Sequence, residues 1–214
     1  MSTTPAVFLD KDGTLLEDIP FNVDPTLMRL EKGAAEGLRS LHAAGFPLIV
    51  ISNQSGVALG HFPESALVAV QAQLERMFRD AGATMAGFYY CPHHPQGTIT
   101  GFVQDCHCRK PQPGLIVRAA REHSIALDRS WFVGDILDDI EAGQRAGCRT
   151  ILINNGHETE WLRTPWRWPD YMVTNLQEAA RIIEARDGLS TLAPSGVKME
   201  ELSCTLEVSR RTEL

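Results

Sequence analysis

The chain has 214 residues, 27 of them acidic and 20 basic, which gives a formal net charge of -7. Hydrophobic residues make up 43% of the sequence, enough for a core, so a wholly disordered chain is excluded. The acidic balance argues against a nucleic-acid partner. The longest apolar run, residues 46–51, is far shorter than the ~20 residues that a membrane span needs, and no signal peptide is apparent, so a membrane or secreted protein is not expected.

Apolar runs and helical periodicities alternate along the chain. Strands are expected at residues 6–9, 46–51, 87–90, 131–134, 149–153 and 171–173, and helices at 33–44, 63–81, 113–123, 139–146 and 176–185. This alternation predicts an α/β fold: a Rossmann-like, doubly wound and mostly parallel sheet with helices on both faces. One domain of residues 1–186 is expected. Residues 187–214 are expected to form a loosely attached C-terminal tail, disordered or with a last edge strand at 205–208.

Polar side chains follow several of these predicted strands. Ligands of an open α/β sheet bind beyond the carboxyl ends of its strands, so these side chains are expected to converge. Each cluster taken alone would also suit an ordinary polar turn, and it is their convergence that indicates a site. The clusters are Asp10 with Asp12, Ser52 with Asn53 and Gln54, and Asp135 with Asp138 and Asp139. Arg109 and Lys110 come just before a predicted helix and could join these clusters.

Asp10 and Asp12 stand close together where the first predicted strand ends. A calcium loop that begins Asp-x-Asp would need Gly and Glu where this chain has Leu15 and Phe21, so that alternative fails, whereas a polar turn without chemistry stays open. As functional groups, one carboxylate would attack an electrophile and the other would shuttle a proton. Asp135 would add a further carboxylate for a divalent cation, and Mg²⁺ prefers such ligands.

The remaining candidates suit the binding of a phosphorylated substrate. Lys110 offers a compact positive charge that can hold a phosphate oxygen through charge-assisted hydrogen bonds. Ser52 offers a hydroxyl group, and Asn53 and Gln54 offer amide donors.

Three of the five cysteines lie close together and near several histidines. The expected ligands are Cys91, His93, Cys106 and Cys108. Such a Cys₃His set would complete a closed, tetrahedral zinc site of the structural type. A disulfide, a redox Cys-x-Cys pair or free thiols are the alternatives, and His94 and His107 are the competing histidines. The two other cysteines, Cys148 and Cys204, are expected to be ordinary thiols.

Four motifs follow one another along the chain: Asp10-Lys11-Asp12-Gly13-Thr14, Ser52, Lys110, and Gly134-Asp135 with Asp139. Together and in this order, they resemble the motifs of the haloacid dehalogenase superfamily of aspartate-nucleophile phosphatases. The resemblance implies that Asp10 is the nucleophile that forms an aspartyl-phosphate and that Asp12 is the general acid and base. It implies that Ser52 and Lys110 bind the phosphoryl oxygens. It also implies a magnesium ion on Asp10, Asp135 and the carbonyl of Asp12, with Asp139 in support.

The segments Cys91-Pro92-His93-His94-Pro95 and Cys106-His107-Cys108-Arg109-Lys110-Pro111 are similar to the D-glycero-D-manno-heptose-1,7-bisphosphate 7-phosphatase family and to the related histidinol-phosphate phosphatases. This resemblance covers residues 6–185. It implies a cytoplasmic, monomeric enzyme without a large cap domain, in which zinc clamps a substrate-facing loop and Arg109 faces the substrate. Leu59 and Ile136, however, stand where the heptose enzymes have basic residues, which weakens the case for a second phosphate.

The expected function is therefore a magnesium-dependent phosphomonoesterase that removes the 7-phosphate of D-glycero-D-manno-heptose 1,7-bisphosphate. A phosphatase of histidinol phosphate or of another small metabolite stays open within the same chemistry. A phosphotransferase also stays open, because it would use the same aspartyl intermediate and differ only in the acceptor. From another class, the alternative is a non-catalytic, zinc-containing binding module. The expected partner is a small phosphorylated sugar, without nucleic acid or membrane.

Overall fold

The computed structural model describes residues 3–162 and 164–187, and the strands of this part form one parallel six-stranded sheet. The strand order is β3-β2-β1-β4-β5-β6. The strands are β1 Val7–Leu9, β2 Leu48–Asn53, β3 Met85–Cys91, β4 Trp131–Gly134, β5 Arg149–Ile153 and β6 Tyr171–Val173. The strand order reverses between β1 and β4, and such a reversal is where open α/β sheets bind their ligands.

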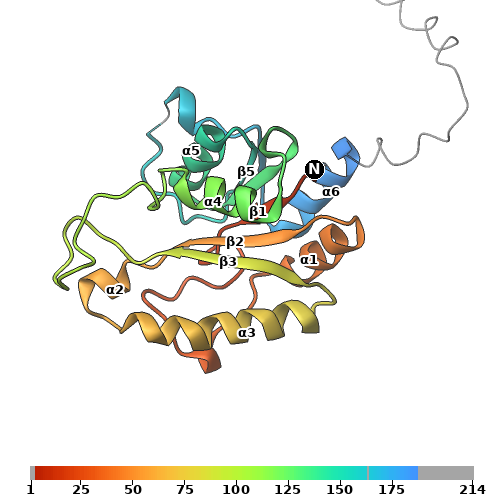
Figure 1. Cartoon of the computed structure of the whole chain (residues 1–214). Coiled ribbons are helices and arrows are strands. Elements are labelled where there is room, and N and C mark those ends of the chain that lie inside the picture. The colour runs from red at the N-terminus through yellow and green to blue at the C-terminus, as the bar shows by residue number, and fades with distance from the viewer. Residues whose placement is uncertain (1–2, 163, 188–214) are drawn as a thin grey trace, which may run out of the picture.

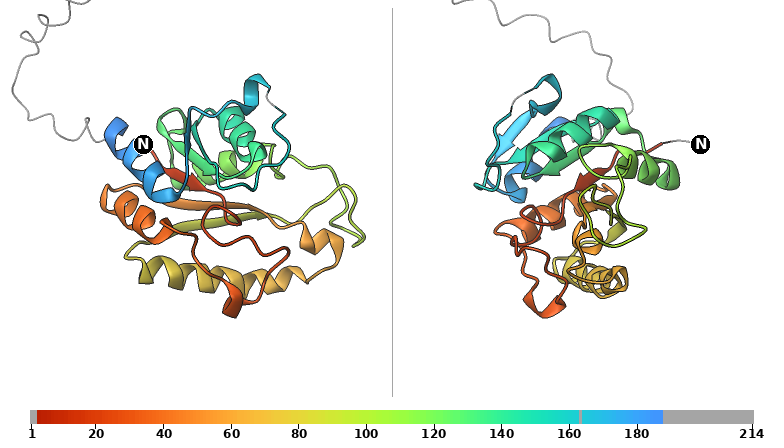
Figure 2. Two further views of the ribbon diagram at one scale, coloured as in Figure 1. Left: turned by 180° about the vertical axis from the view of Figure 1, so that it is seen from behind. Right: turned by 90° about the vertical axis from the view of Figure 1, so that its left-hand side faces the viewer.

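Helices cover both faces of this sheet (Figures 1 and 2). The α-helices are α1 Ala34–Ala43, α2 Gly56–Leu59, α3 Leu67–Asp80, α4 Gly114–His123, α5 Leu137–Ala146 and α6 Leu176–Asp187. Short 3-10 helices lie at η1 Pro25–Leu27, η2 Glu64–Ala66, η3 Leu127–Arg129 and η4 Pro165–Arg167. The core clusters place α1, α3 and α6 against one face and α4 and α5 against the other.

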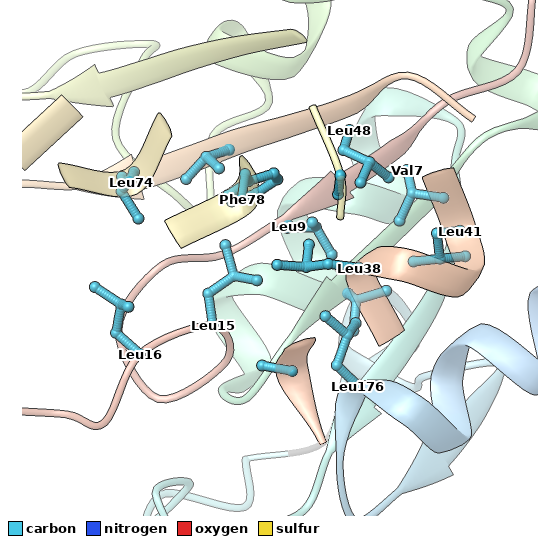
Figure 3. Packing of buried hydrophobic residues seen from close by; sticks show 14 of the residues in the cluster. Val7, Leu9, Leu15, Leu16, Leu38, Leu41, Leu48, Leu74, Phe78 and Leu176 are labelled. Carbon is cyan, nitrogen blue, oxygen red and sulfur yellow. The ribbon is translucent and has the colours of Figure 1, made fainter. Parts of the chain in front are cut away.

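Alternation along the strands divides the core into two layers. In β1, Val7 and Leu9 belong to the cluster with α1, α3 and α6, whereas Phe8 belongs to the cluster with α4 and α5. Figure 3 shows the first cluster, with Leu38 of α1 and Leu176 of α6 on the same side as Val7 and Leu9. A central strand that is buried on both faces must be apolar throughout, which explains why β1 is a continuous apolar run.

The predicted α/β fold and its parallel sheet are confirmed. Strands β4, β5 and β6 have the expected bounds. Strand β2 begins at Leu48, later than expected, because Pro47 has no N–H for the strand ladder, and it continues to Asn53. Ser52 and Asn53 are therefore the last residues of a strand, which places them at the carboxyl edge of the sheet.

Two helical predictions need correction, and one short helix was not predicted. Pro63 precedes the 3-10 helix η2, and α3 begins only at Leu67, although its predicted apolar face is buried as expected. Helix α5 begins at Leu137 rather than at Asp139, so Asp139 lies in the first turn, where the helix dipole favours negative charge. Helix α2 was not expected, because so short a helix shows no periodicity in the sequence.

The named strands of the described part all belong to this one sheet. Helix α6 ends at Asp187. The rest of the proposed tail, with Cys204 and the expected strand at 205–208, lies outside the described residues. Among the described helices, none combines the length and the apolar character that crossing a bilayer requires.

Candidate active site

The carboxyl ends of β1 and β4 bring three predicted aspartates together. Asp10 follows β1 and Asp135 follows β4, and the N–H of Asp10 donates to the carbonyl of Val133 at 3.0 Å, which joins the two strand ends. Asp139 reaches the same place from the first turn of α5. Oxygens of Asp10, Asp135 and Asp139 lie within 4.8 Å of one another, and all three residues are buried.

Lys110 brings a positive charge into this acidic cluster. Its buried Nζ forms ion pairs with Asp10 and, at 2.6 Å, with Asp139, and it donates to the carbonyl of Ile51 at 3.2 Å. Burial opposes the charge, but the two carboxylates outweigh burial and raise the pKa of Lys110. Asn53 at the end of β2 holds the Lys110 backbone, because its side chain accepts from the N–H at 3.0 Å and donates to the carbonyl at 3.1 Å.

The carboxylates of this cluster outnumber the Lys110 ammonium group. Burial, together with the charge of Asp139, outweighs Lys110 and raises the pKa of Asp10 to about 6. Burial and the charges of Asp10 and Asp139 raise the pKa of Asp135 to about 9. A divalent cation would relieve this repulsion, and clustered carboxylate oxygens are the donors that Mg²⁺ takes, so these residues fit a magnesium ion.

Asp12 faces a cleft of about 240 Å³ beside the acidic cluster. Its side chain is 33% exposed, and Gln54 Nε2 donates both to Asp12 Oδ2 at 3.2 Å and to the buried hydroxyl of Ser52 at 2.8 Å. Burial, with a contribution from the charge of Asp10, raises the pKa of Asp12, which suits a group that must deliver a proton. The cleft is lined by Asp12, Asp18, Ile19, Pro20, Phe21, Asn22, Asn53, Gln54, Ser55, Gly56 and Phe62.

Known proteins are similar to this chain in sequence and in fold. The family model described as HAD-hydrolase-like matches residues 107–179. The D-glycero-beta-D-manno-heptose-1,7-bisphosphate 7-phosphatase of Yersinia pestis is 32% identical over 185 residues, which cover 86% of this chain and 97% of that protein. The chain belongs to the haloacid dehalogenase superfamily of phosphatases.

Two further relatives agree with this membership. The phosphatase of the same name from Escherichia coli strain K12 is 37% identical over 155 residues, which cover 72% of this chain and 81% of that protein. The solved structure of D,D-heptose 1,7-bisphosphate phosphatase from B. bronchiseptica, complexed with magnesium and phosphate, is 26% identical with a TM-score of 0.70. That match covers 86% of this chain and 99% of that chain.

A second cluster of possible metal ligands lies at the end of β3 and in the loop that follows it in this haloacid dehalogenase-like phosphatase. The sulfur of Cys108 lies 3.2 Å from that of Cys91 and 3.1 Å from that of Cys106, and Nδ1 of His93 lies 3.2 Å from the Cys108 sulfur. These separations exceed the ~2.05 Å of a disulfide bond, so the three thiols are free. Three sulfurs and one imidazole nitrogen in this compact arrangement fit a structural zinc ion.

The competing histidines lie outside this group. The Nδ1 atom of His94 accepts a hydrogen bond from the N–H of Gln96 at 3.1 Å, and His107 is exposed. The tip of the loop packs against α2, where the carbonyl of Ala58 accepts from the N–H groups of Thr98 and Ile99 at 2.7 and 3.0 Å. Figure 1 shows α2 and this loop at the same end of the sheet.

Arg109 connects the cysteine cluster to Lys110 in the sequence. Its Nη1 atom is buried and has no hydrogen-bond partner among the described residues. A buried donor that is left unpaired costs free energy.

The segment after β5 contributes residues to the site that were not predicted from the sequence. Nδ1 of His157 lies 2.9 Å from Oδ2 of Asp135, and Asn155 Nδ2 donates to the carbonyl of Gly13 at 2.7 Å. Thr14 Oγ1 donates to the other oxygen of Asp135 at 3.0 Å. The rule that polar residues at strand ends converge would have selected Asn155 and His157 as well, since both follow β5.

Proposed function

We propose that this phosphatase is a magnesium-dependent phosphomonoesterase that works through an aspartyl-phosphate on Asp10. The observation that supports this most is the convergence of Asp10 and Asp135, at the ends of adjacent strands, with Lys110 from the loop before α4. It combines a nucleophile, carboxylates for a cation and a positive charge for phosphoryl oxygens at one point. The structure of the B. bronchiseptica relative, which is complexed with magnesium and phosphate, adds support.

Two proton transfers by Asp12 would connect the two halves of the reaction. In the first half, a carboxylate oxygen of Asp10 attacks phosphorus, the bond to the leaving oxygen breaks, and Asp12 gives that oxygen a proton. In the second half, Asp12 takes a proton from a water molecule whose oxygen attacks the same phosphorus, which releases inorganic phosphate and Asp10. Lys110 and the Ser52 hydroxyl hold the phosphoryl oxygens throughout, because phosphoryl transfer depends mainly on positioning and charge stabilisation.

Asp10, Asp135 and the backbone carbonyl of Asp12 would hold the magnesium ion, with Asp139 in support. When bound, the ion neutralises charge on the phosphoryl oxygens. Asn53 would act through the Lys110 backbone that it holds, and Gln54 would orient Asp12 and Ser52, to which its amide donates.

The proposed substrate is D-glycero-D-manno-heptose 1,7-bisphosphate, which would lose its 7-phosphate, as the names of the Y. pestis and E. coli relatives suggest. Arg109 would then meet the substrate. A second candidate, histidinol phosphate or another small monophosphate, is supported by the cleft, since no Lys or Arg is among its lining residues. Leu59 and Ile136 also favour this candidate. In either case we expect a cytoplasmic monomer that acts on a small phosphorylated molecule, without nucleic acid or membrane.

The rates of hydrolysis of three phosphate esters distinguish these two candidate functions. Phosphate release from heptose 1,7-bisphosphate, heptose 7-phosphate and histidinol phosphate gives kcat/KM for each. A preference of about 100-fold for the bisphosphate over the 7-monophosphate, or about 2.7 kcal/mol, would support a subsite for the second phosphate. Equal values, or a preference for histidinol phosphate, would support the second candidate. No release from any phosphate ester would contradict the proposed function.

Replacing Asp12 with Asn is expected to lower kcat by about 10²–10⁴-fold, because an amide cannot exchange the proton that the leaving group and the water require. With 4-nitrophenyl phosphate, whose leaving group needs no proton, the variant should release a rapid burst of about one nitrophenol per chain and then turn over slowly. Stopped-flow absorbance measures both phases. An unchanged steady-state rate would contradict the role of Asp12.

Replacing Cys108 with Ser is expected to lower the zinc content and to reduce turnover by up to about 10²-fold, since the loop then misplaces Arg109 and Lys110. Elemental analysis of the purified protein measures zinc directly, and Cys148→Ala, which removes a thiol outside the cluster, is the control. Much less than one zinc per chain in the unmodified protein would contradict the zinc proposal.

A further inference from the structure

His157 makes a specific contact with a proposed magnesium ligand. Its Nδ1 atom lies 2.9 Å from Oδ2 of Asp135. When Asp135 is ionised, as a metal ligand must be, its carboxylate can only accept, so Nδ1 then carries the proton of this hydrogen bond. Asp135 is buried, whereas the side chain of His157 is 31% exposed at the rim of the site. Thr14 occupies the other carboxylate oxygen at 3.0 Å, so Asp135 is oriented from both sides.

The position of His157 is itself determined by its neighbours. Asn155 ties the segment to the carbonyl of Gly13 at 2.7 Å, and Glu158 Oε2 accepts from the N–H of Leu137 at 2.6 Å at the start of α5. The segment is thus anchored on both sides of His157. Two separate elements, the turn after β1 and the beginning of α5, supply these anchors.

Gly13 shows how closely these groups approach. It has a φ of +79°, and a Cβ atom there would lie 2.1 Å from Oδ2 of Asp135 and 2.4 Å from Nδ1 of His157. Any side chain would therefore collide with this hydrogen-bonded pair. The absence of a side chain at Gly13 is what allows the pair to lie against the turn that carries Asp12.

We propose that His157 is a positioning residue of the magnesium site, which fixes the Asp135 carboxylate toward the cation by donating from Nδ1 to Oδ2. This inference rests on the proposed magnesium-dependent function. Groups that hydrogen-bond a metal ligand orient it, and their loss commonly costs about 10–100-fold in metal affinity. His157 would therefore set the affinity for magnesium without touching phosphorus or the leaving group.

The test is the binding of Mg²⁺ alone, measured by calorimetry in the absence of substrate. His157→Asn places an amide donor near the position of Nδ1, whereas His157→Gln places it near that of Nε2. We expect the Asn variant to bind within about 3-fold of the unmodified protein, and the Gln and Ala variants to bind about 10–100-fold more weakly. At saturating magnesium, kcat of the Gln variant should recover. His42→Ala, which removes an exposed histidine on α1, is the control.

The outcomes separate this inference from the proposed function. Equal magnesium affinity for the Asn and Gln variants, or an Ala variant within about twofold of the unmodified protein, would overturn the role of His157 alone. Melting temperatures in magnesium-free buffer should agree among the variants. If the Ala variant unfolds, the difference in magnesium affinity between the Asn and Gln variants still tests the role of His157. An unmodified protein that neither binds magnesium nor hydrolyses phosphate esters would overturn the proposed function, and this inference with it.

Discussion

Asp10→Asn is expected to reduce phosphate release by about four orders of magnitude or more, the scale at which enzymes lose activity when the nucleophile is removed. The amide has nearly the volume of the carboxylate but is a very poor nucleophile. It also removes one negative charge from a buried cluster in which Asp10, Asp135 and Asp139 repel one another. The variant should therefore remain folded, and its melting temperature should equal or exceed that of the unmodified protein.

The control for this prediction is Asp128→Asn. Asp128 is exposed in the 3-10 helix η3, which precedes β4 and so lies away from the carboxyl ends of the strands. Its replacement should change neither the rate nor the melting temperature. Phosphate release by Asp10→Asn at a rate close to that of the unmodified protein would eliminate Asp10 as the nucleophile, whatever the behaviour of the control.

The fold could be predicted from the sequence because its central strands are buried on both faces. Strand β4 is a continuous apolar run and β5 ends in one, and the bounds of both strands agree with the expectation. The errors lie where local pattern is weak. Helix α2 is too short to show periodicity, and the start of α5 was placed at its acidic residues, although Leu137 already packs in the core.

The part of the site that lies directly at the strand ends could be predicted from the sequence. Asp10 and Asp135 follow adjacent strands, so the sheet itself brings them together. Lys110 has no such signal, because it reaches the cluster through the backbone contact with Asn53, a residue distant in the sequence. Local patterns contain no information about such pairs. His157 follows β5, so the strand-end rule could have selected it, but its contact with Asp135 is visible only in the structure.

Removal of magnesium is expected to stop catalysis reversibly while the protein stays folded and keeps its zinc. Without the ion, burial and mutual repulsion hold the pKa of Asp135 near 9, so the site loses both its charge neutralisation and the ionised form of a ligand. The sheet that carries these residues depends on its apolar core rather than on the ion. Desalting into magnesium-free buffer suits this experiment, because a strong chelator would also compete for zinc.

The magnesium-free protein should show unchanged circular dichroism and unchanged zinc by elemental analysis, and added MgCl₂ should restore full phosphate release. NaCl at equal ionic strength should restore none, and Ca²⁺ should restore little, since it takes more ligands at longer distances than Mg²⁺.

Asp135→Asn, which removes a proposed ligand, should not recover at any magnesium concentration. Full activity in magnesium-free buffer would contradict the metal requirement, whereas loss of zinc on desalting would show that the two metal sites cannot be separated. The acidic cluster lies at the ends of β1 and β4, whereas the thiol cluster lies at the end of β3 and in the loop after it. Separate loss of the two ions is therefore the result that this geometry predicts.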